Sequence, residues 1–315
     1  MIITALAGGV GGAKLADGLA RALPPTDLSI IVNTGDDFEH LGLKICPDLD
    51  TVCYTLAGLA NPETGWGIKD ETWHTLESLE TLNGPSWFRL GDHDLGTHLE
   101  RTRRLREGCT LSEVTRAFCK AWGVAPRVIP MSDQPIPTTV YTQEGSLSFQ
   151  EYFVHRRCEP KVTGFSFEGV ENSAPAAGVI EALQSADLVV ICPSNPWVSI
   201  APILAVPGVK KALEGKCVVA VSPIVGGHAI KGPAAKMYQE LGIIPSATAV
   251  AKHYRSSTDK GILTGFIIDC LDAPQSADIQ ELGLRVLVTD TVMSTSADRL
   301  RLAQEILLFG KDLST

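Results

Sequence analysis

The chain has 315 residues, of which 44% are hydrophobic and 20% are charged, and its formal net charge is −9. A chain of this size can bury a full core as one large α/β domain or two smaller ones, while its negative charge argues against a nucleic acid partner. No apolar run reaches membrane-spanning length, and the eight scattered cysteines form no Cys-x-x-Cys pair. We therefore expect a cytoplasmic enzyme with small-molecule substrates.

The first element is an apolar strand over residues 2–7 that runs into GGVGGAK at residues 8–14 and then into a helix. Glycines bring backbone N–H groups close to a ligand, and the new helix points its positive end at an anion, so this run predicts a phosphate-binding turn. Two standard patterns fail. Lys14 follows Ala13 and precedes Leu15, unlike a Walker loop, and it stands where a dinucleotide fingerprint needs Gly or Ala. A plain strand-to-helix turn is the alternative.

Further along, apolar strands alternate with amphipathic helices. This alternation predicts a Rossmann-like, mainly parallel sheet with helices on both faces. The expected strands are residues 28–33, 187–192, 216–222, 265–269 and 284–288, and the expected helices include residues 178–184, 232–241 and 295–309.

Residues 51–122 interrupt this alternation and are typical of consecutive helices. One of them begins at a capping box, Thr110 with Glu113, and Gly123 is a plausible end signal. Residues 138–142 and 146–149 then predict a β-hairpin. We interpret residues 1–315 as one α/β nucleotide-binding domain with a helical and hairpin insertion at about residues 51–155.

Small polar residues follow four of the expected strands, at residues 33–37 with 46–51, 8–14, 193–196 and 222–227. Ligands of open parallel sheets bind beyond the carboxyl ends of the strands, so these segments predict one binding site.

Four acidic residues in these segments are candidates for holding a metal: Asp36, Asp37, Asp48 and Asp50. Carboxylates beside an anion-binding turn favour Mg²⁺, which binds carboxylate oxygens and bridges to phosphates. In the alternatives, Asp50 caps a helix that starts at Thr51, Asp48 holds a turn, and Asp36 or Asp37 binds a ribose hydroxyl. We favour Asp36 and Asp50 as the metal ligands.

The chain resembles the 2-phospho-L-lactate transferases of deazaflavin coenzyme biosynthesis over nearly its whole length. The motifs that carry the resemblance are GGVGGAK at 8–14, VNTGDD at 32–37, PDLDT at 47–51, GWG at 65–67, LGDHDL at 90–95 with Thr97 and His98, PMSD at 130–133, PSNP at 193–196 and SPI at 222–224. In this family the ribityl hydroxyl of 7,8-didemethyl-8-hydroxy-5-deazariboflavin attacks a guanylylated phospholactate, or its enolpyruvyl counterpart. The phosphorylated three-carbon acid is transferred, GMP leaves, and Mg²⁺ is required.

The resemblance implies a role for each group of residues. Gly9, Gly11, Gly12 and Lys14 would bind the diphosphate, Asp36 and Asp50 would carry Mg²⁺, and Ser194, Asn195, Ser222 and Gly226 would contact the guanosine part or the phosphates. The insertion would form the acceptor pocket, with Trp66, Trp87 and Phe88 as flat surfaces and Asp92, His93, Thr97 and Arg101 as polar contacts. Asp92 or Asp37 would orient the attacking hydroxyl. It also suggests a homodimer.

Several readings compete with these. Trp87, like Trp73 and Trp122, has the helical spacing of a core residue, and the arginines from Arg101 to Arg106 are typical of a solvated helix face. A nicotinamide-dependent dehydrogenase would explain the opening and an acid after the second strand, but not Lys14. A non-catalytic nucleotide-sugar-binding regulator would explain the phosphate-binding turn, but it would not need the tryptophan-bearing insertion.

Overall fold

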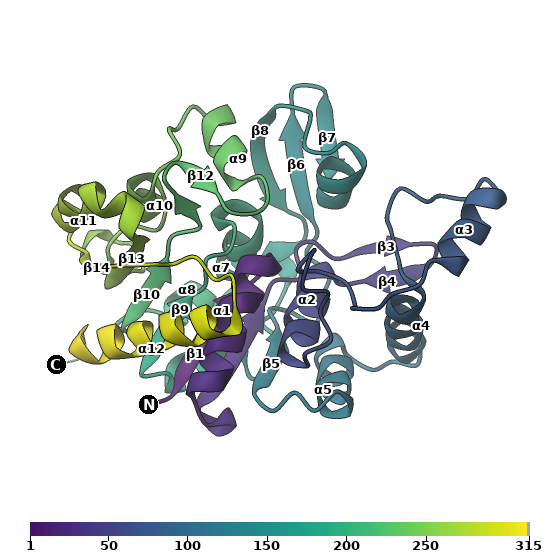
Figure 1. The fold of residues 1–315 in the computed structure, drawn as a ribbon, viewed down its shortest axis with the longest axis horizontal. Coiled ribbons are helices and arrows are strands. Elements are labelled where there is room, and N and C mark those ends of the chain that lie inside the picture. The colour runs from purple at the N-terminus through teal and green to yellow at the C-terminus, as the bar shows by residue number, and fades with distance from the viewer. Residues whose placement is uncertain (314–315) are drawn as a thin grey trace.

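Seven parallel strands form the central sheet in a computed structural model that describes residues 1–313 (Figure 1). The strand order is β14-β13-β10-β9-β1-β2-β5, with Ile3 of β1 opposite Leu28 of β2 on one side and Leu188 of β9 on the other. The strands are β1 Ile3–Ala7, β2 Leu28–Val32, β5 Arg127–Pro130, β9 Leu188–Ile191, β10 Val218–Val221, β13 Gly265–Asp269 and β14 Arg285–Thr289. The chain order reverses between β1 and β9, which is where open α/β sheets bind ligands.

Helices cover both faces of the sheet, as the alternation predicted. Successive strand residues point to opposite faces, so Leu6 joins one apolar cluster while Ala5 and Ala7 join the other. On the face of Ala5 lie α1 Gly9–Ala22, α2 Pro47–Leu56, α5 Leu111–Ala121 and α12 Ser296–Leu313. On the face of Leu6 lie α6 Val179–Ser185, α7 Ala201–Ala205, α8 Val209–Ala212, α9 Ala234–Glu240, α10 Ala247–Tyr254 and α11 Ser276–Glu281.

The remaining elements surround the carboxyl edge of the sheet. They are the pair β3 Phe38–His40 and β4 Leu43–Ile45, the sheet of β6 Thr138–Thr142, β7 Gly145–Ser148 and β8 Val162–Phe167, the pair β11 Ile224–Val225 and β12 His228–Ala229, and the helices α3 His74–Thr81 and α4 Asp92–Arg106. Short 3₁₀ turns occupy Pro25–Asp27, Val170–Asn172, Ser257–Asp259 and Cys270–Gln275, and π-helical turns occupy Glu151–His155 and Pro196–Ile200. No helix within residues 1–313 has the length and apolar character needed to cross a membrane.

The middle of the chain is helical as predicted, and the capping box of Thr110 and Glu113 is present. The structure also differs from the prediction in three ways. Helix α2 begins at Pro47 rather than at residue 51, so Asp50 lies inside its first turn and is not its cap. Strand β5 pairs with β2 although it lies within the predicted insertion, and the predicted hairpin gains β8 as a third strand.

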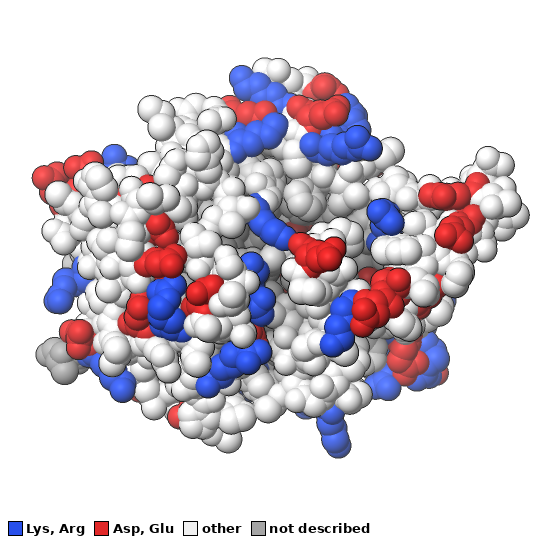
Figure 2. Space-filling view, in the orientation of Figure 1, with Lys and Arg blue, Asp and Glu red and all other residues white. Residues whose placement is uncertain are grey.

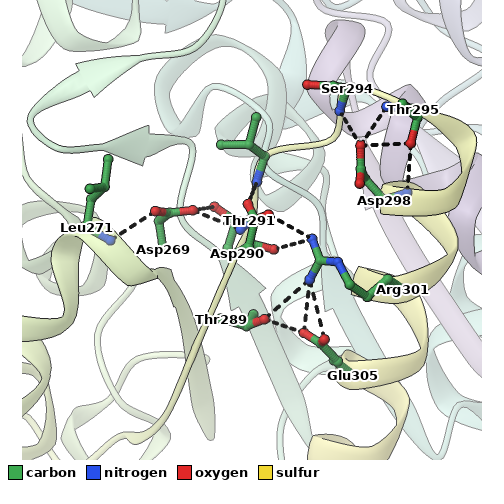
Figure 3. A network of polar contacts seen from close by, with 11 residues as sticks. Asp269, Leu271, Thr289, Asp290, Thr291, Ser294, Thr295, Asp298, Arg301 and Glu305 are labelled. Atoms are coloured by element: carbon green, nitrogen blue, oxygen red, sulfur yellow. Dashed lines mark hydrogen bonds and ion pairs between the residues drawn. The ribbon is translucent and has the colours of Figure 1, made fainter.

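Polar contacts attach the last helix to the sheet (Figure 3). Asp269, at the end of β13, accepts hydrogen bonds from the backbone and hydroxyl of Thr291 at 2.8 and 3.1 Å. At the start of α12, Asp298 accepts from the backbone N–H of Thr295 at 2.7 Å, and its own N–H donates to the Thr295 hydroxyl at 3.2 Å, which is a capping box. Arg301 joins α12 to the end of β14. These contacts hold the segment before α12 beside α1, which packs against α12.

Candidate functional site

A pocket of about 600 Å³ opens at the carboxyl edge of the sheet, beside the point where the chain order reverses. One wall is polar and comes from the start of α1, the start of α2 and the segment after β9; the other is aromatic and comes from the loop before α4 and the π-helical turn Glu151–His155. Figure 2 shows a hollow near the centre of this face, below the sheet of β6–β8, with charged side chains at its edge.

The glycine run forms the first turn of α1 rather than a long loop. Gly9 has a φ of 65°, which favours glycine, and its N–H donates to Asp48 Oδ1 at 2.7 Å. The Gly8 N–H donates to Ser194 Oγ at 3.0 Å. The amides of Val10 and Gly11 belong to the first turn, where N–H groups have no acceptor within the helix, and both residues line the pocket. An anion in the pocket would face the positive end of α1.

The glycines also allow close packing. A Cβ on Gly8 would lie 2.5 Å from Asp48 Oδ2, one on Gly11 would lie 2.4 Å from the Pro193 carbonyl oxygen, and one on Gly12 would lie 2.5 Å from Ser194 Oγ. Gly8, Gly9 and Gly11 line the pocket, whereas Gly12 is buried behind it. The run therefore serves both the pocket and the packing of α1 against the segment after β9.

Lys14 does not line the pocket. Its Nζ donates to the Met293 carbonyl oxygen at 2.7 Å, and burial, with Arg299 and Lys231 nearby, lowers the pKa of its amine. Within residues 1–313, the lysine and arginine side chains that line the pocket are Lys231 and Arg89. Lys231 Nζ donates to the Thr64 carbonyl oxygen at 2.6 Å.

Asp36 and Asp48 form a buried acid pair on the polar wall. The Asn33 side-chain amide donates to Asp36 Oδ1 at 3.0 Å and to Asp48 Oδ2 at 2.9 Å. Burial and the charge of Asp48 raise the pKa of Asp36, and burial raises the pKa of Asp48 to about 6. No basic side chain among residues 1–313 forms an ion pair with either carboxylate, and two carboxylates this close favour a bound proton or a cation.

The other two candidate acids have cationic partners. Asp50 lines the pocket, but both of its oxygens bind the buried guanidinium of Arg101. Asp37 does not line it and lies 3.3 Å from Lys44 Nζ. Burial raises the pKa of Asp37, and Lys44 partly opposes this.

The acid pair fits a divalent cation that keeps other ligands. Within residues 1–313, no group of three or more His, Cys, Asp or Glu side chains is arranged to hold a metal ion. An ion at Asp36 and Asp48 would take its remaining oxygen ligands from water and phosphate, as Mg²⁺ commonly does. Asp36 and Asp50 as ligands stay a prediction, and the geometry adds Asp48.

The aromatic wall contains Trp66, Trp87, Phe88, Phe149 and Phe153. The rings of Phe149 and Phe153 are stacked, with centroids 5.4 Å apart and an interplanar angle of 9°. Trp66 and Phe153 are 48% and 38% exposed, so their rings have free surface. Large exposed rings on a pocket wall suit a planar aromatic ligand.

Asp92 caps α3. Its carboxylate accepts from the Thr72 hydroxyl at 2.6 Å and from the backbone N–H groups of His74 and Thr75 at 3.0 Å, and these bonds hold its pKa below the ordinary range. Glu71 in turn accepts from the His93 N–H at 2.6 Å, at the start of α4. These contacts engage Asp92 and the His93 N–H with neighbouring residues, and neither residue lines the pocket. Thr97 does not line it either.

Of the sequence-predicted residues after β9 and β10, some line the pocket and others do not. Ser194 and Asn195 line the pocket, and the Asn195 side chain caps the π-helical turn Pro196–Ile200. Ser222 instead bonds to the backbone of Ile224, and the Gly226 N–H donates to Asp272, so neither faces the pocket.

The pocket residues that were not among the sequence-predicted site residues include Tyr54, Asp94 and His98. Asp94 and His98 stand four residues apart on α4, and Arg101 follows at the next turn. This spacing places the three on one helix face, a signal that was present in the sequence. Asp92 is two residues from Asp94 and points about 200° away around the helix.

Residues 3–292 match the family model described as 2-phospho-L-lactate transferase CofD. A protein of Streptomyces griseus named phosphoenolpyruvate transferase is 43% identical over 97% of this chain and 99% of its own length. A protein of Thermobifida fusca with the same name is 41% identical over 87% of this chain and 88% of its own. Among solved structures, a UPF0052 family protein of Bacillus halodurans has a similar fold, with a TM-score of 0.63 and 17% identity over 97% of this chain and 98% of its own.

Proposed function

We propose a function from the family to which the chain belongs, the 2-phospho-L-lactate transferase CofD family. In this proposal the protein moves a phosphorylated three-carbon acid from a guanylylated donor to the ribityl hydroxyl of 7,8-didemethyl-8-hydroxy-5-deazariboflavin. GMP is released. One observation supports this above the others: a single pocket joins a helix N-terminus and an acid pair to an aromatic wall. The names of the Streptomyces and Thermobifida relatives favour the phosphoenolpyruvyl donor over the phospholactyl one.

The polar wall suits the donor's diphosphate. Val10 and Gly11, in the first turn of α1, line the pocket, and Lys231 adds a cation to its lining. Ser194 and Asn195 complete this wall and would contact the phosphates or the guanosine part.

Asp36 and Asp48 would hold Mg²⁺ against the diphosphate, with Asp50 as the further ligand predicted from the sequence. When bound, the ion neutralises charge on the phosphate oxygens and the leaving group. The protein's own contribution is the position of the two acids, which Asn33 fixes through its side-chain amide.

The aromatic wall suits the acceptor's ring system. Trp87 and Phe88 are edge-to-face with centroids 5.7 Å apart, and Phe149 and Phe153 stack nearby along the same pocket. A ring held there would place its ribityl chain toward the polar wall.

We also propose a homodimer, which light scattering of the purified protein would test.

The proposal is tested by GMP release. The protein is incubated with the deazaflavin precursor and the enolpyruvyl or the lactyl guanylylated acid, with and without Mg²⁺, and GMP is measured by chromatography. We expect release only when precursor, donor and Mg²⁺ are all present. Tight binding of guanine nucleotide with no release from either donor would contradict the proposal and favour a regulator.

A further inference from the structure

Helix α4 presents polar side chains to the pocket on one face. Asp94 and His98 line the pocket, and Arg101 lies one turn further along the helix. His98 is 1% exposed and Arg101 is 3% exposed. Polar side chains buried this deeply need hydrogen-bond partners, and here the partners form a chain that leads back to the pocket.

The chain of contacts begins at Asp50, which binds the Arg101 guanidinium through both oxygens. Arg101 Nη1 also lies 3.2 Å from His98 Nδ1. A guanidinium only donates, so Nδ1 is the acceptor, and we assign the ring proton of His98 to Nε2 on this hydrogen-bond pattern. His98 Nε2 lies 3.4 Å from Asp94 Oδ1, which is within the distance of an ion pair but lacks the geometry of a hydrogen bond.

The same oxygen, Asp94 Oδ1, accepts a hydrogen bond from a tyrosine. The Tyr54 hydroxyl donates to Asp94 Oδ1 at 2.6 Å. Burial raises the pKa of Asp94, but the contacts with His98 and Tyr54 outweigh it and hold that pKa below the ordinary range. The Asp94 carboxylate, which lines the pocket, is therefore bound at Oδ1 by the Tyr54 hydroxyl with His98 Nε2 nearby, while its Oδ2 takes part in neither contact.

We propose that Asp94 is a catalytic residue whose Oδ2 accepts the hydrogen bond of the attacking ribityl hydroxyl and takes its proton during transfer. The assignment rests on the proposed function, and it gives to Asp94 the role predicted from the sequence for Asp92 or Asp37. Tyr54, His98 and Arg101 are positioning residues that act through Asp94.

The step balances with the proposed substrates alone. The hydroxyl oxygen forms a bond to the phosphorus that carries the three-carbon acid, and the bond from that phosphorus to the oxygen shared with GMP breaks. The shared oxygen keeps the electron pair and leaves as part of the GMP phosphate. The hydroxyl proton passes to Asp94 Oδ2 and then to solvent. A carboxylate with a lowered pKa is a weak base, so we expect it to orient the hydroxyl first and to take the proton late.

The test compares two acids of one motif by GMP release. Asp94→Asn should lower kcat by about 10²–10⁴-fold, the range for loss of a positioned base, with little change in the Kd of GDP measured by calorimetry. Asp92→Asn should lower Tm through the lost cap of α3 and reduce kcat far less than Asp94→Asn does. Glu100→Gln, an exposed acid on the same helix that pairs with Arg103 and Arg104, is the matched control and should keep wild-type kcat.

Two further readouts separate catalysis from folding. Asp94→Glu keeps the carboxylate and should recover part of the kcat that Asp94→Asn loses. Tyr54→Phe should lower kcat while leaving the KM of the donor unchanged, because it loosens Asp94 without touching the polar wall.

The outcomes are distinct. If wild-type protein releases GMP and Asp94→Asn stays within threefold of its kcat, or Asp92→Asn loses more than Asp94→Asn, the assignment of Asp94 is overturned while the proposed function stands. If wild-type protein releases no GMP with either donor, the proposed function fails and the assignment fails with it. If Asp94→Asn does not fold, a kcat of Asp94→Glu more than about threefold below wild type, with GDP binding kept, supports the assignment, and a kcat within about threefold of wild type overturns it.

Discussion

The acid pair should make the protein less stable at neutral pH than it would be without one of the two charges. Asp48 is buried and shares the Asn33 amide with Asp36, and its pKa is raised from 3.8 to about 6. In the unfolded chain Asp48 has an ordinary pKa, so near pH 7.5 folding places a charge where it is disfavoured. We predict that Asp48→Asn raises the free energy of unfolding near pH 7.5.

The magnitude follows from the pKa. A rise of about two units corresponds to about 3 kcal/mol. Asn keeps one acceptor for the Gly9 N–H but loses the carboxylate's bond to the Asn33 amide, which offsets about 1–2 kcal/mol. The expected net gain is about 1–2 kcal/mol, or a rise in Tm of roughly 1.5–3 °C for a protein of this size.

The direction in which this stability gain changes with pH also follows from the raised pKa. A raised carboxyl pKa means that between pH 6 and about pH 4 the folded protein holds a proton that the unfolded chain has released, so the penalty disappears as the pH falls. The gain of Asp48→Asn should therefore be present near pH 7.5 and absent near pH 4. Added Mg²⁺ should raise the Tm of the wild type near pH 7.5 and raise that of Asp48→Asn much less.

Thermal unfolding followed by circular dichroism, at both pH values and with or without Mg²⁺, measures all of these quantities. Glu39→Gln is the control, because it removes one negative charge from an exposed side chain of the nearby strand β3. A loss of stability in Asp48→Asn near pH 7.5, or an equal response to Mg²⁺ in wild type and variant, would contradict a strained, cation-binding carboxylate at Asp48.

Three further predictions concern ligand binding. Lys231→Ala should weaken GDP binding about 10–100-fold by calorimetry, whereas Lys14→Ala should change it less than threefold and lower Tm, and the reverse order would restore Lys14 as the diphosphate cation. Gly8→Ala should abolish GDP binding, because its Cβ would lie 2.5 Å from Asp48 Oδ2, and wild-type affinity would show that the turn yields easily. Phe153→Ala should weaken precursor binding about tenfold by deazaflavin fluorescence and spare GDP, and equal effects on both would contradict separate walls.

The fold was predictable because its signals are local. Apolar strands such as residues 187–192 alternate with helices, and both the parallel sheet and its covered faces are confirmed. Strands β3 and β4 were missed because three residues each are too short to show a period. The start of α2 was placed late, at Thr51 with Asp50 as its cap. The helix begins at Pro47, and proline favours the first position of a helix.

The site was predictable as a region but not by residue. The motifs identified the correct strand ends, yet a motif does not say which side chain of a helix turns inward. Asp92 and Asp94 stand in one motif on opposite sides of α4, and the cap of α3 decides between them. Lys231 lies far along the chain from the glycine turn, so only the folded protein brings it to the pocket in which Gly9 lies.

The mass of the acceptor after reaction shows whether the protein transfers a group to it. Wild-type protein is mixed with the deazaflavin precursor, Mg²⁺ and equal amounts of the enolpyruvyl and lactyl guanylylated acids, and the products are analysed by mass spectrometry. We expect the precursor to gain one phosphorylated three-carbon acid and one GMP to appear for each product formed, with the enolpyruvyl group preferred. GMP without a heavier precursor would indicate hydrolysis of the donor, and neither product would indicate a binding protein; each result would contradict the transferase account.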